Sequence, residues 1–175
     1  MAKLRKMLGR ADSPYIVALM RLIESQSNAT IADWGVRFVE ETKVPIYEKA
    51  YPQDSILREA LAVFQRFRGG DMRLPALKKA VAQVNMAAKA AEAEPAAQAA
   101  AKAVSQAIAS LYTPTHSLGM AFYGAAAVAY DRVGLEETQE TYEAIAAQEC
   151  ENMRLALLTV AIPDEKNPAK INWHC

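Results

Sequence analysis

The chain has 175 residues, of which 52% are hydrophobic and only 7% aromatic, and its 20 basic residues balance 20 acidic ones, so the formal net charge is zero. This length corresponds to one globular domain, and the balanced charge excludes a nucleic-acid coat or a polyanionic tail, because both need a large excess of one charge. No run of about 18 apolar residues is present, so we expect no membrane-spanning helix. Alanine, with 35 residues, is expected to build much of the core.

Prolines and glycines divide the first half of the chain into predicted helices. Ser13 and Pro14 begin the first helix, because serine is a good N-cap and proline suits the first helical position. Residues 1–12 form a basic N-terminal arm, which we expect to be a solvated end. The first helix breaks at residues 25–28, and a second ends near Val44, because Pro45 disfavours helix in the residue before it. Further helices are expected over residues 45–51, from 54 or 55 to 68, and from 74 to the boundary at 94 and 95.

Alanine dominates the central helices of the second half. One helix spans residues 96–111, the next restarts at 113–115 and is closed by Gly134, and the last is capped by Thr138 and stops before Pro163. Residues 163–175 then form an extended tail, which we expect to dock because Trp173 is costly to leave exposed. Small side chains let helix axes approach closely, so the alanine-rich helices are expected to form the centre.

The predicted fold class is all-α, because no segment combines strand-like alternation with the turn chemistry of a β-hairpin. We expect a single domain over residues 1–175, built as a multi-helix bundle of about seven or eight helices with an alanine-rich central core and an extended C-terminal tail. A solenoid of helix pairs is the alternative architecture.

Several signatures of catalysis and metal binding are missing from the sequence. Neither His116 nor His174 has a glutamate three residues before it, which excludes the Glu-x-x-His motif of ferritin-like bundles. Cys150 is far from the adjacent His174 and Cys175, so a zinc site has weak support, and no phosphate-binding loop follows Gly69. We therefore expect no cofactor, no metal and no catalytic residue. Two cysteines make no disulfide framework, which favours the cytoplasm.

A polar and aromatic group is predicted on the helix that follows residue 115. His116 and Tyr123 are seven residues apart and share a helix face, and Asp131 lies further along. The helix start favours an anion and would lower the pKa of His116. Two interpretations stay open: a ligand-contacting or general-base histidine, and a histidine that organises the helix start.

An aromatic group, formed by Trp34, Tyr47, Glu48 and Tyr51, is a second candidate. Aromatic rings with a polar tip anchor interfaces, so these side chains could line a recognition pocket. Rings of this kind also pack around short connecting helices. The sequence leaves both interpretations open.

An acidic run near the end of the chain is the third candidate. No lysine or arginine occurs from Leu135 until Arg154, and Glu136, Glu140 and Glu143 can lie on one face. Such a run is either a solvated surface or a docking face for a basic partner. Residues 1–81 hold 14 basic and 9 acidic residues, whereas residues 82–175 hold 6 and 11, so the neutral chain is expected to be dipolar. That polarity favours a charge-guided protein partner or head-to-tail self-association.

Four stretches together resemble one protein family. They are Trp34-Gly-Val-Arg-Phe-Val-Glu, Pro45-Ile-Tyr-Glu-Lys-Ala-Tyr-Pro-Gln-Asp, Arg58-Glu-Ala-Leu and Thr113-Pro-Thr-His-Ser-Leu-Gly-Met-Ala-Phe-Tyr-Gly-Ala-Ala. The chain resembles bacterial immunity proteins of the immunity-five-like group, associated with polymorphic toxin systems, over residues 30–130. The segments around Tyr51-Pro52-x-Asp54 and His116 are the most specific, which adds Asp54 to the candidate binding residues. Many relatives carry further histidines where this chain offers Gln106 or nearby residues, and Tyr112, so part of any histidine site is lost.

The resemblance implies protection by a toxin-binding protein that occludes its target in the cytoplasm without catalysis. A standard-sized interface with complementary charge is then expected, and the acidic run predicts a basic toxin. Two alternatives stay open. One is a helical small-molecule-binding protein or enzyme that uses His116 with Tyr123 or Asp131. The other is an oligomeric structural or stress protein assembled through its alanine-rich helices, and neither involves nucleic acid or a membrane.

Overall fold

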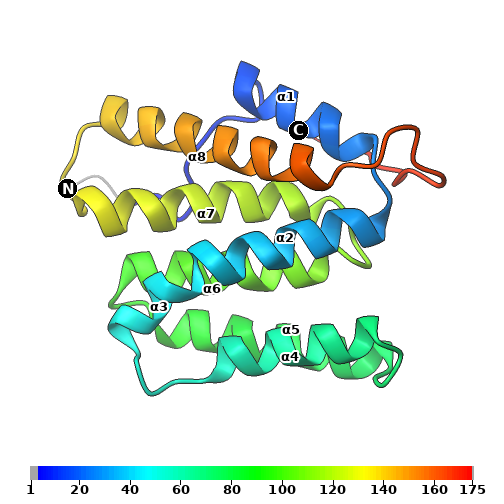
Figure 1. Ribbon diagram of the computed structural model, residues 1–175. Coiled ribbons are helices and arrows are strands. Elements are labelled where there is room, and N and C mark those ends of the chain that lie inside the picture. Colours follow the sequence, from blue (N-terminus) through cyan, green and yellow to red (C-terminus); the bar gives the residue numbers. More distant parts are fainter. Residues whose placement is uncertain (1–3, 175) are drawn as a thin grey trace.

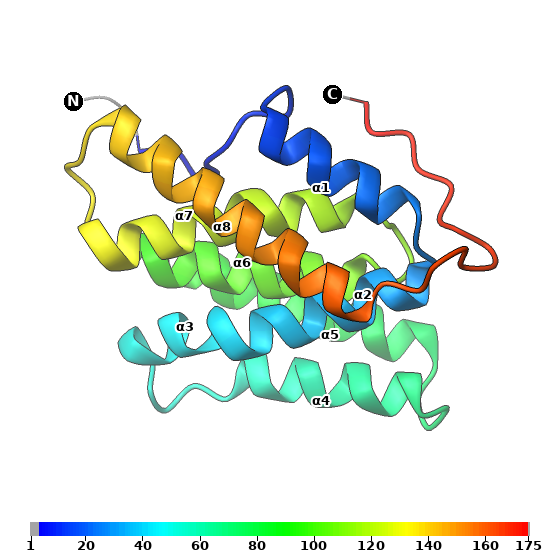
Figure 2. The ribbon, with the colours of Figure 1, turned by 45° about the horizontal axis from the view of Figure 1, so that its top comes forward.

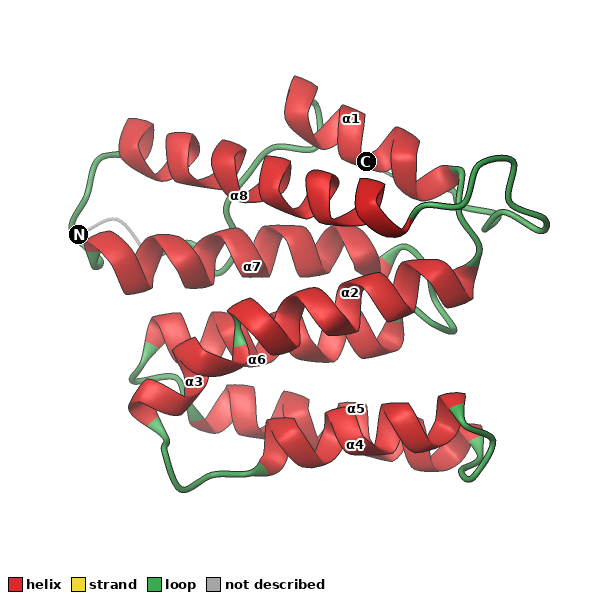
Figure 3. Cartoon of the chain, viewed as in Figure 1, coloured by secondary structure: helices red, strands yellow, loops and turns green. Residues whose placement is uncertain are grey.

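The computed structural model describes residues 4–174, and within this range the chain forms eight α-helices and no β-strand (Figures 1 and 3). The helices are α1 (Pro14–Glu24), α2 (Asn28–Thr42), α3 (Val44–Ala50), α4 (Ile56–Arg68), α5 (Leu74–Ala90), α6 (Pro95–Ala109), α7 (His116–Val133) and α8 (Gln139–Val160). The all-α prediction is confirmed. Residues 1–3 of the predicted N-terminal arm, and Cys175, lie outside the described residues.

Local sequence signals explain where the helices begin and end. The hydroxyls of Ser27 and Thr138 cap α2 and α8 by accepting hydrogen bonds from backbone N–H groups in the first turn. Gly134, whose φ is 77°, ends α7 in a conformation that most other residues avoid. Pro45 lies in the first turn of α3, where its missing N–H costs no helical hydrogen bond.

Helix α6 lies at the centre of the bundle, in contact with α2, α3, α5 and α7. Of its 15 residues, 10 are buried, and 7 of these are alanines. Figures 1 and 2 show α8 and α1 beyond α7 on one side, and α5 and α4 on the other. The predicted alanine-rich central core is therefore confirmed, and small side chains allow α6 to have neighbours on several sides.

The N-terminal arm packs against α7. Leu8 is 3% exposed, and its N–H donates to the carbonyl of Phe122 at 3.2 Å. The phenol of Tyr130 donates to the carbonyl of Arg5. Gly9 has a φ of 108°, and a Cβ there would come within 2.9 Å of the Phe122 ring. The expectation of a solvated end is therefore wrong for this segment, because Leu8 provides an apolar anchor.

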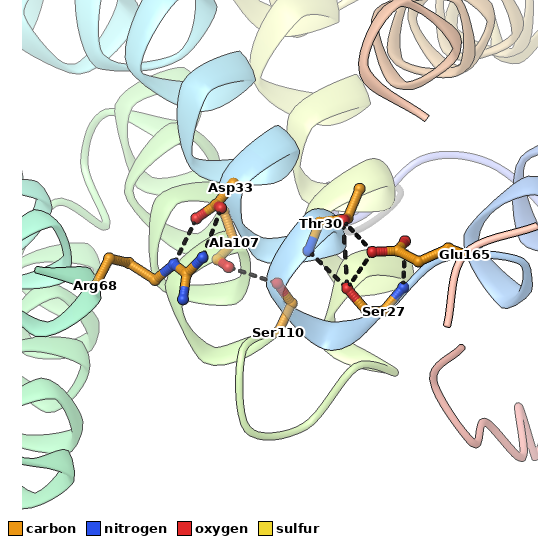
Figure 4. A network of polar contacts seen from close by, with 7 residues as sticks. All are labelled: Ser27, Thr30, Asp33, Arg68, Ala107, Ser110 and Glu165. Carbon is orange, nitrogen blue, oxygen red and sulfur yellow. Dashed lines mark hydrogen bonds and ion pairs between the residues drawn. The ribbon is translucent and has the colours of Figure 1, made fainter. Parts of the chain in front are cut away.

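The C-terminal tail crosses the ends of α1 and α2. Glu165 accepts hydrogen bonds from the N–H and hydroxyl of Ser27, both at 2.8 Å, and from the hydroxyl of Thr30 (Figure 4). The Ala169 N–H donates to the carbonyl of Gln26 at 2.8 Å, and the indole N–H of Trp173 donates to Glu24. These contacts attach the tail to the start of α2.

Candidate functional site

The motif residues between α3 and α4 hold that corner together. The phenol of Tyr47, which is buried, donates to Asp54 at 2.6 Å, and Asp54 also accepts from the Ile56 N–H at the start of α4. Arg58 donates to both oxygens of Glu48, at 2.8 and 3.1 Å. We call Tyr47, Glu48, Tyr51, Asp54 and Arg58 the α3–α4 corner.

Electrostatics in the α3–α4 corner follow from these contacts. Burial, followed by the hydrogen bond to Asp54, raises the pKa of Tyr47, so the phenol stays protonated. The hydrogen bond from Arg58 lowers the pKa of Glu48, so the carboxylate stays ionised. The rings of Tyr47 and Tyr51 lie 5.1 Å apart. The polar side chains of Tyr47, Asp54, Glu48 and Arg58 all have partners within the protein, which is the arrangement of a structural clasp.

Trp34 does not join this corner. It is 3% exposed on α2, and its indole N–H donates to the carbonyl of Met153 on α8 at 3.1 Å. The predicted aromatic group is therefore divided: three of its members stabilise the α3–α4 corner, and Trp34 attaches α2 to α8.

His116 begins α7 and contacts α6. Its Nδ1 lies 2.7 Å from the side-chain oxygen of Gln106, so Nδ1 carries the proton. A Cβ at Gly119 would come within 2.3 Å of that oxygen, so the glycine makes room for Gln106. Burial lowers the pKa of His116. Gln106 or a nearby residue lies where the resemblance places a histidine in many relatives, and here Gln106 contacts His116.

Tyr123 and Asp131 face other parts of the protein than His116 does. Tyr123 lines a cleft beside the N-terminal arm, whereas Asp131 accepts from Lys49 of α3 at 2.7 and 2.8 Å. His116 and Asp131 are separated by about 22 Å along α7, given a rise of 1.5 Å per residue. The structure therefore does not bring the three side chains to one reacting centre.

The acidic run is divided between several environments. Glu136 precedes α8 in an exposed loop, and Glu140 is exposed in the first turn of α8. Glu143 is turned toward Tyr15, whose phenol lies 3.5 Å away, and toward Arg5 at 3.8 Å. Glu149 is buried. Only the beginning of the run therefore forms an exposed acidic surface.

We call Val133, Leu135, Glu136, Glu137 and Glu140 the α7–α8 corner. Val133 and Leu135 are 36% and 46% exposed, and they are two of several large aliphatic side chains that the structure leaves on the surface. All three glutamates are exposed, and within residues 4–174 none of them forms an ion pair. The corner thus combines exposed aliphatic side chains with carboxylates that have no cationic partner within residues 4–174.

A buried ion pair between Lys43 and Glu149 was not predicted from the sequence. Lys43 is 0% and Glu149 4% exposed, and the Lys43 ammonium donates to a Glu149 oxygen and to the hydroxyl of Thr42 at 3.0 Å. The second Glu149 oxygen accepts from Asn152 at 3.3 Å. The ammonium also lies 4.8 Å from the ring centre of Phe38.

The ion pair forms the floor of a surface pocket. This pocket has a volume of about 340 Å³ and is also lined by Lys49, Asp131 and Arg132. Burial lowers the pKa of Lys43, and Glu149 opposes that change. Burial raises the pKa of the neighbouring Cys150 thiol to about 12, so this thiol is neutral and inert at neutral pH.

The sequence contained a signal for Glu149. Ile145 and Met153 have the spacing of one helix face, and Glu149 lies midway between them, four residues from each. Lys43 likewise lies four residues after the buried Val39. A charged residue at a buried position of α8, and another at the buried C-cap of α2, indicate a buried ion pair, because an isolated buried charge is too costly.

The described residues 4–174 were expected to hold no metal site and no membrane-spanning helix, and the structure contains no feature of either kind. Among residues 4–174, no group of three or more histidine, cysteine, aspartate or glutamate side chains is arranged to hold a metal ion. None of the helices that the structure describes is long and apolar enough to cross a membrane.

Comparison with protein-family models gives one match, described as Imm-5 like putative immunity protein, over residues 21–156. The chain belongs to this family. The resemblance found in the sequence is thereby confirmed, and the matched range includes the α3–α4 corner, His116 and the Lys43–Glu149 pair. Comparison with curated proteins and with solved structures gave no match.

Proposed function

We propose that this immunity-family protein binds a cognate toxin and neutralises it by occluding the toxin's active surface. Such a mechanism needs a complementary surface and no chemistry from the immunity protein. The observation that supports this function best is the α7–α8 corner, where two exposed aliphatic side chains are followed in the sequence by three exposed glutamates. This is the usual anatomy of an interface, with an apolar centre and a polar rim.

The carboxylates of the corner differ from several surface acids that are paired within the protein. Asp33 binds Arg68, Glu48 binds Arg58, and Glu151 binds Arg154, each with at least one contact of 2.9 Å or less. Three unpaired glutamates within five residues are therefore a local excess of negative charge. An excess of this kind accelerates association with a positively charged partner and selects against negatively charged ones.

The corner predicts the kind of toxin that is bound. A basic toxin domain would pair its lysines or arginines with Glu136, Glu137 and Glu140 and cover Leu135 with an apolar side chain. A stable complex of this kind buries roughly 1,200–2,000 Å² in total, so the contact would extend beyond the corner along α8 or α7.

The function is tested in the organism that encodes the chain. The tagged protein is used for affinity capture, and captured polypeptides are identified by mass spectrometry. The proposal predicts a basic polypeptide that arrests growth when it is expressed alone and loses this effect when it is expressed with the immunity protein. If no captured polypeptide is toxic, or if co-expression leaves growth arrested, the proposal is wrong. Capture of further copies of this chain alone would favour the oligomeric alternative.

A further inference from the structure

A second surface feature carries charge of the opposite sign. A cleft with a volume of about 610 Å³ lies between the N-terminal arm, the α5–α6 corner and α7. It is lined by four basic side chains, Arg5, Lys6, Lys89 and Lys102, and by a single acidic one, Glu92. Its volume lies in the range of small-molecule sites, which is roughly 300–1,000 Å³.

The positive charges of this cleft are poorly neutralised by the protein. Within residues 4–174, Lys6, Lys89 and Lys102 form no ion pair, and the Lys102 ammonium donates to the neutral side-chain oxygen of Asn85 at 2.9 Å. Burial lowers the pKa of Lys102, and the charge of Lys6 lowers it further. A bound anion would relieve this crowding of like charges.

Hydrogen bonds within the protein hold the walls of the cleft in place without a ligand. The hydrogen bonds from Tyr130 to the Arg5 carbonyl and from the Leu8 N–H to the Phe122 carbonyl hold the arm on α7. Such preorganisation lowers the entropic cost of binding, because the basic side chains of the arm are already placed beside those of α5 and α6.

The cleft also offers contacts for a flat, polar ring. Tyr123 lines it with a half-buried ring, and aromatic side chains stack with nucleobases. The side-chain oxygen of Asn85 accepts from Lys102 and from Ser105, at 2.9 and 3.0 Å. Its NH₂ group forms no hydrogen bond within the described part of the chain and is therefore available as a donor.

We propose that the cleft binds a nucleotide, with the phosphates against Lys89 and Lys102 and the base against Tyr123. The basic groups of this preformed cleft suit the phosphates of a nucleotide, and its aromatic ring and amide donor suit the flat, polar base. This inference does not depend on the toxin, and it is tested without one.

The test is calorimetric titration of the full chain with ATP, adenosine and tripolyphosphate. We expect ATP to bind at least about tenfold more tightly than adenosine or tripolyphosphate, because only ATP uses both the lysines and the ring. The variant K89M/K102M should weaken ATP binding by at least about tenfold, since charge-assisted hydrogen bonds to phosphate are lost. The matched control K79M/K166M removes two exposed lysines outside the cleft and should change the affinity by less than about twofold.

Folding of each variant is checked by urea unfolding, and K89M alone serves as a milder variant because Lys89 is exposed. The proposal is overturned if ATP shows no binding at about 1 mM, a concentration that detects even weak sites. It is also overturned if tripolyphosphate binds as tightly as ATP, which would indicate a site for phosphate charge alone. Equal ATP affinity in K89M/K102M and K79M/K166M would place the binding elsewhere.

Discussion

The α3–α4 corner and the α7–α8 corner both gather acidic side chains at a turn between helices, yet those side chains have different partners. In the α3–α4 corner, Glu48 binds Arg58 and Asp54 binds Tyr47. In the α7–α8 corner, Glu136 and Glu140 have no cationic partner among residues 4–174. A polar group that is satisfied internally stabilises the fold, whereas an unsatisfied exposed group is available to a partner molecule.

The largest stability effect is expected where internal pairing is combined with full burial. Glu149→Ala would leave the Lys43 charge buried without its carboxylate, which costs about 3–5 kcal/mol of unfolding free energy. Glu151→Ala is the control, because Glu151 pairs with Arg154 on the surface and should contribute less than about 1 kcal/mol. Urea unfolding of both variants measures the difference. Similar losses in the two variants would contradict the assigned role of burial.

Removing a hydrogen bond from the structural clasp of the α3–α4 corner should cost less unfolding free energy than Glu149→Ala. Tyr47→Phe removes the phenol that donates to the Asp54 carboxylate, and we expect a loss of about 1.5 kcal/mol, as for hydrogen bonds to charged groups. Tyr51→Phe keeps the ring beside Tyr47 and removes a hydroxyl that forms no hydrogen bond within residues 4–174, so its loss should be below about 0.5 kcal/mol. Equal unfolding free energies of the two variants would show that the Tyr47 hydrogen bond does not stabilise the corner.

His116 predicts a modest dependence of stability on pH. Burial lowers the pKa of His116 in the folded protein below the ordinary value of 6.5, which the unfolded chain keeps. At a pH between these two pKa values, the unfolded chain binds more protons than the folded protein does. Stability should therefore fall as the pH is lowered through this window. His116→Gln should reduce the fall, whereas His174→Gln, in the exposed part of the tail, should leave it unchanged. Urea unfolding between about pH 7 and pH 5 tests this, and identical pH profiles for the wild type and His116→Gln would refute it.

The smallest effect on stability is expected at the α7–α8 corner. E136K/E140K alters a loop carboxylate and one in the first turn of α8, where the helix dipole contributes about 0.3–1 kcal/mol. E59K/D71K is a matched control, because Glu59 lies in the first turn of α4 and Asp71 in a loop. Both variants should lose less than about 1.5 kcal/mol in urea unfolding. A much larger loss of unfolding free energy in E136K/E140K would show that the α7–α8 corner stabilises the fold.

Local signals predicted most of the fold. Capping residues, prolines and glycines mark helix ends by backbone geometry, so the ends of α4, α5 and α7 were close to expectation. Contacts between segments that are distant in the sequence were harder to predict from local signals. Leu8 is one of several apolar residues in a basic arm, and neither its burial nor the Gln106–His116 contact follows from any local pattern.

The candidate site was also predictable only in part, because the partners of its residues come from segments that are distant in the sequence. Sequence spacing places His116, Tyr123 and Asp131 on one helix, but it does not show that their partners come from different neighbours. Glu149 shows the opposite case, because its position in the apolar stripe of α8 indicated burial, whereas its partner Lys43 lies 106 residues away. Which acids are paired depends on tertiary packing, and that pairing separates the structural acids from the free ones.

The central claim is that the free carboxylates of the α7–α8 corner bind the toxin, and it is tested most directly by the affinity of the captured toxin for two charge-reversal variants. E136K/E140K and E59K/D71K change the net charge by the same amount, so any general charge effect is shared. We predict that E136K/E140K weakens binding by roughly tenfold or more, whereas E59K/D71K changes it by less than about twofold. Equal affinities for the two variants would contradict the account.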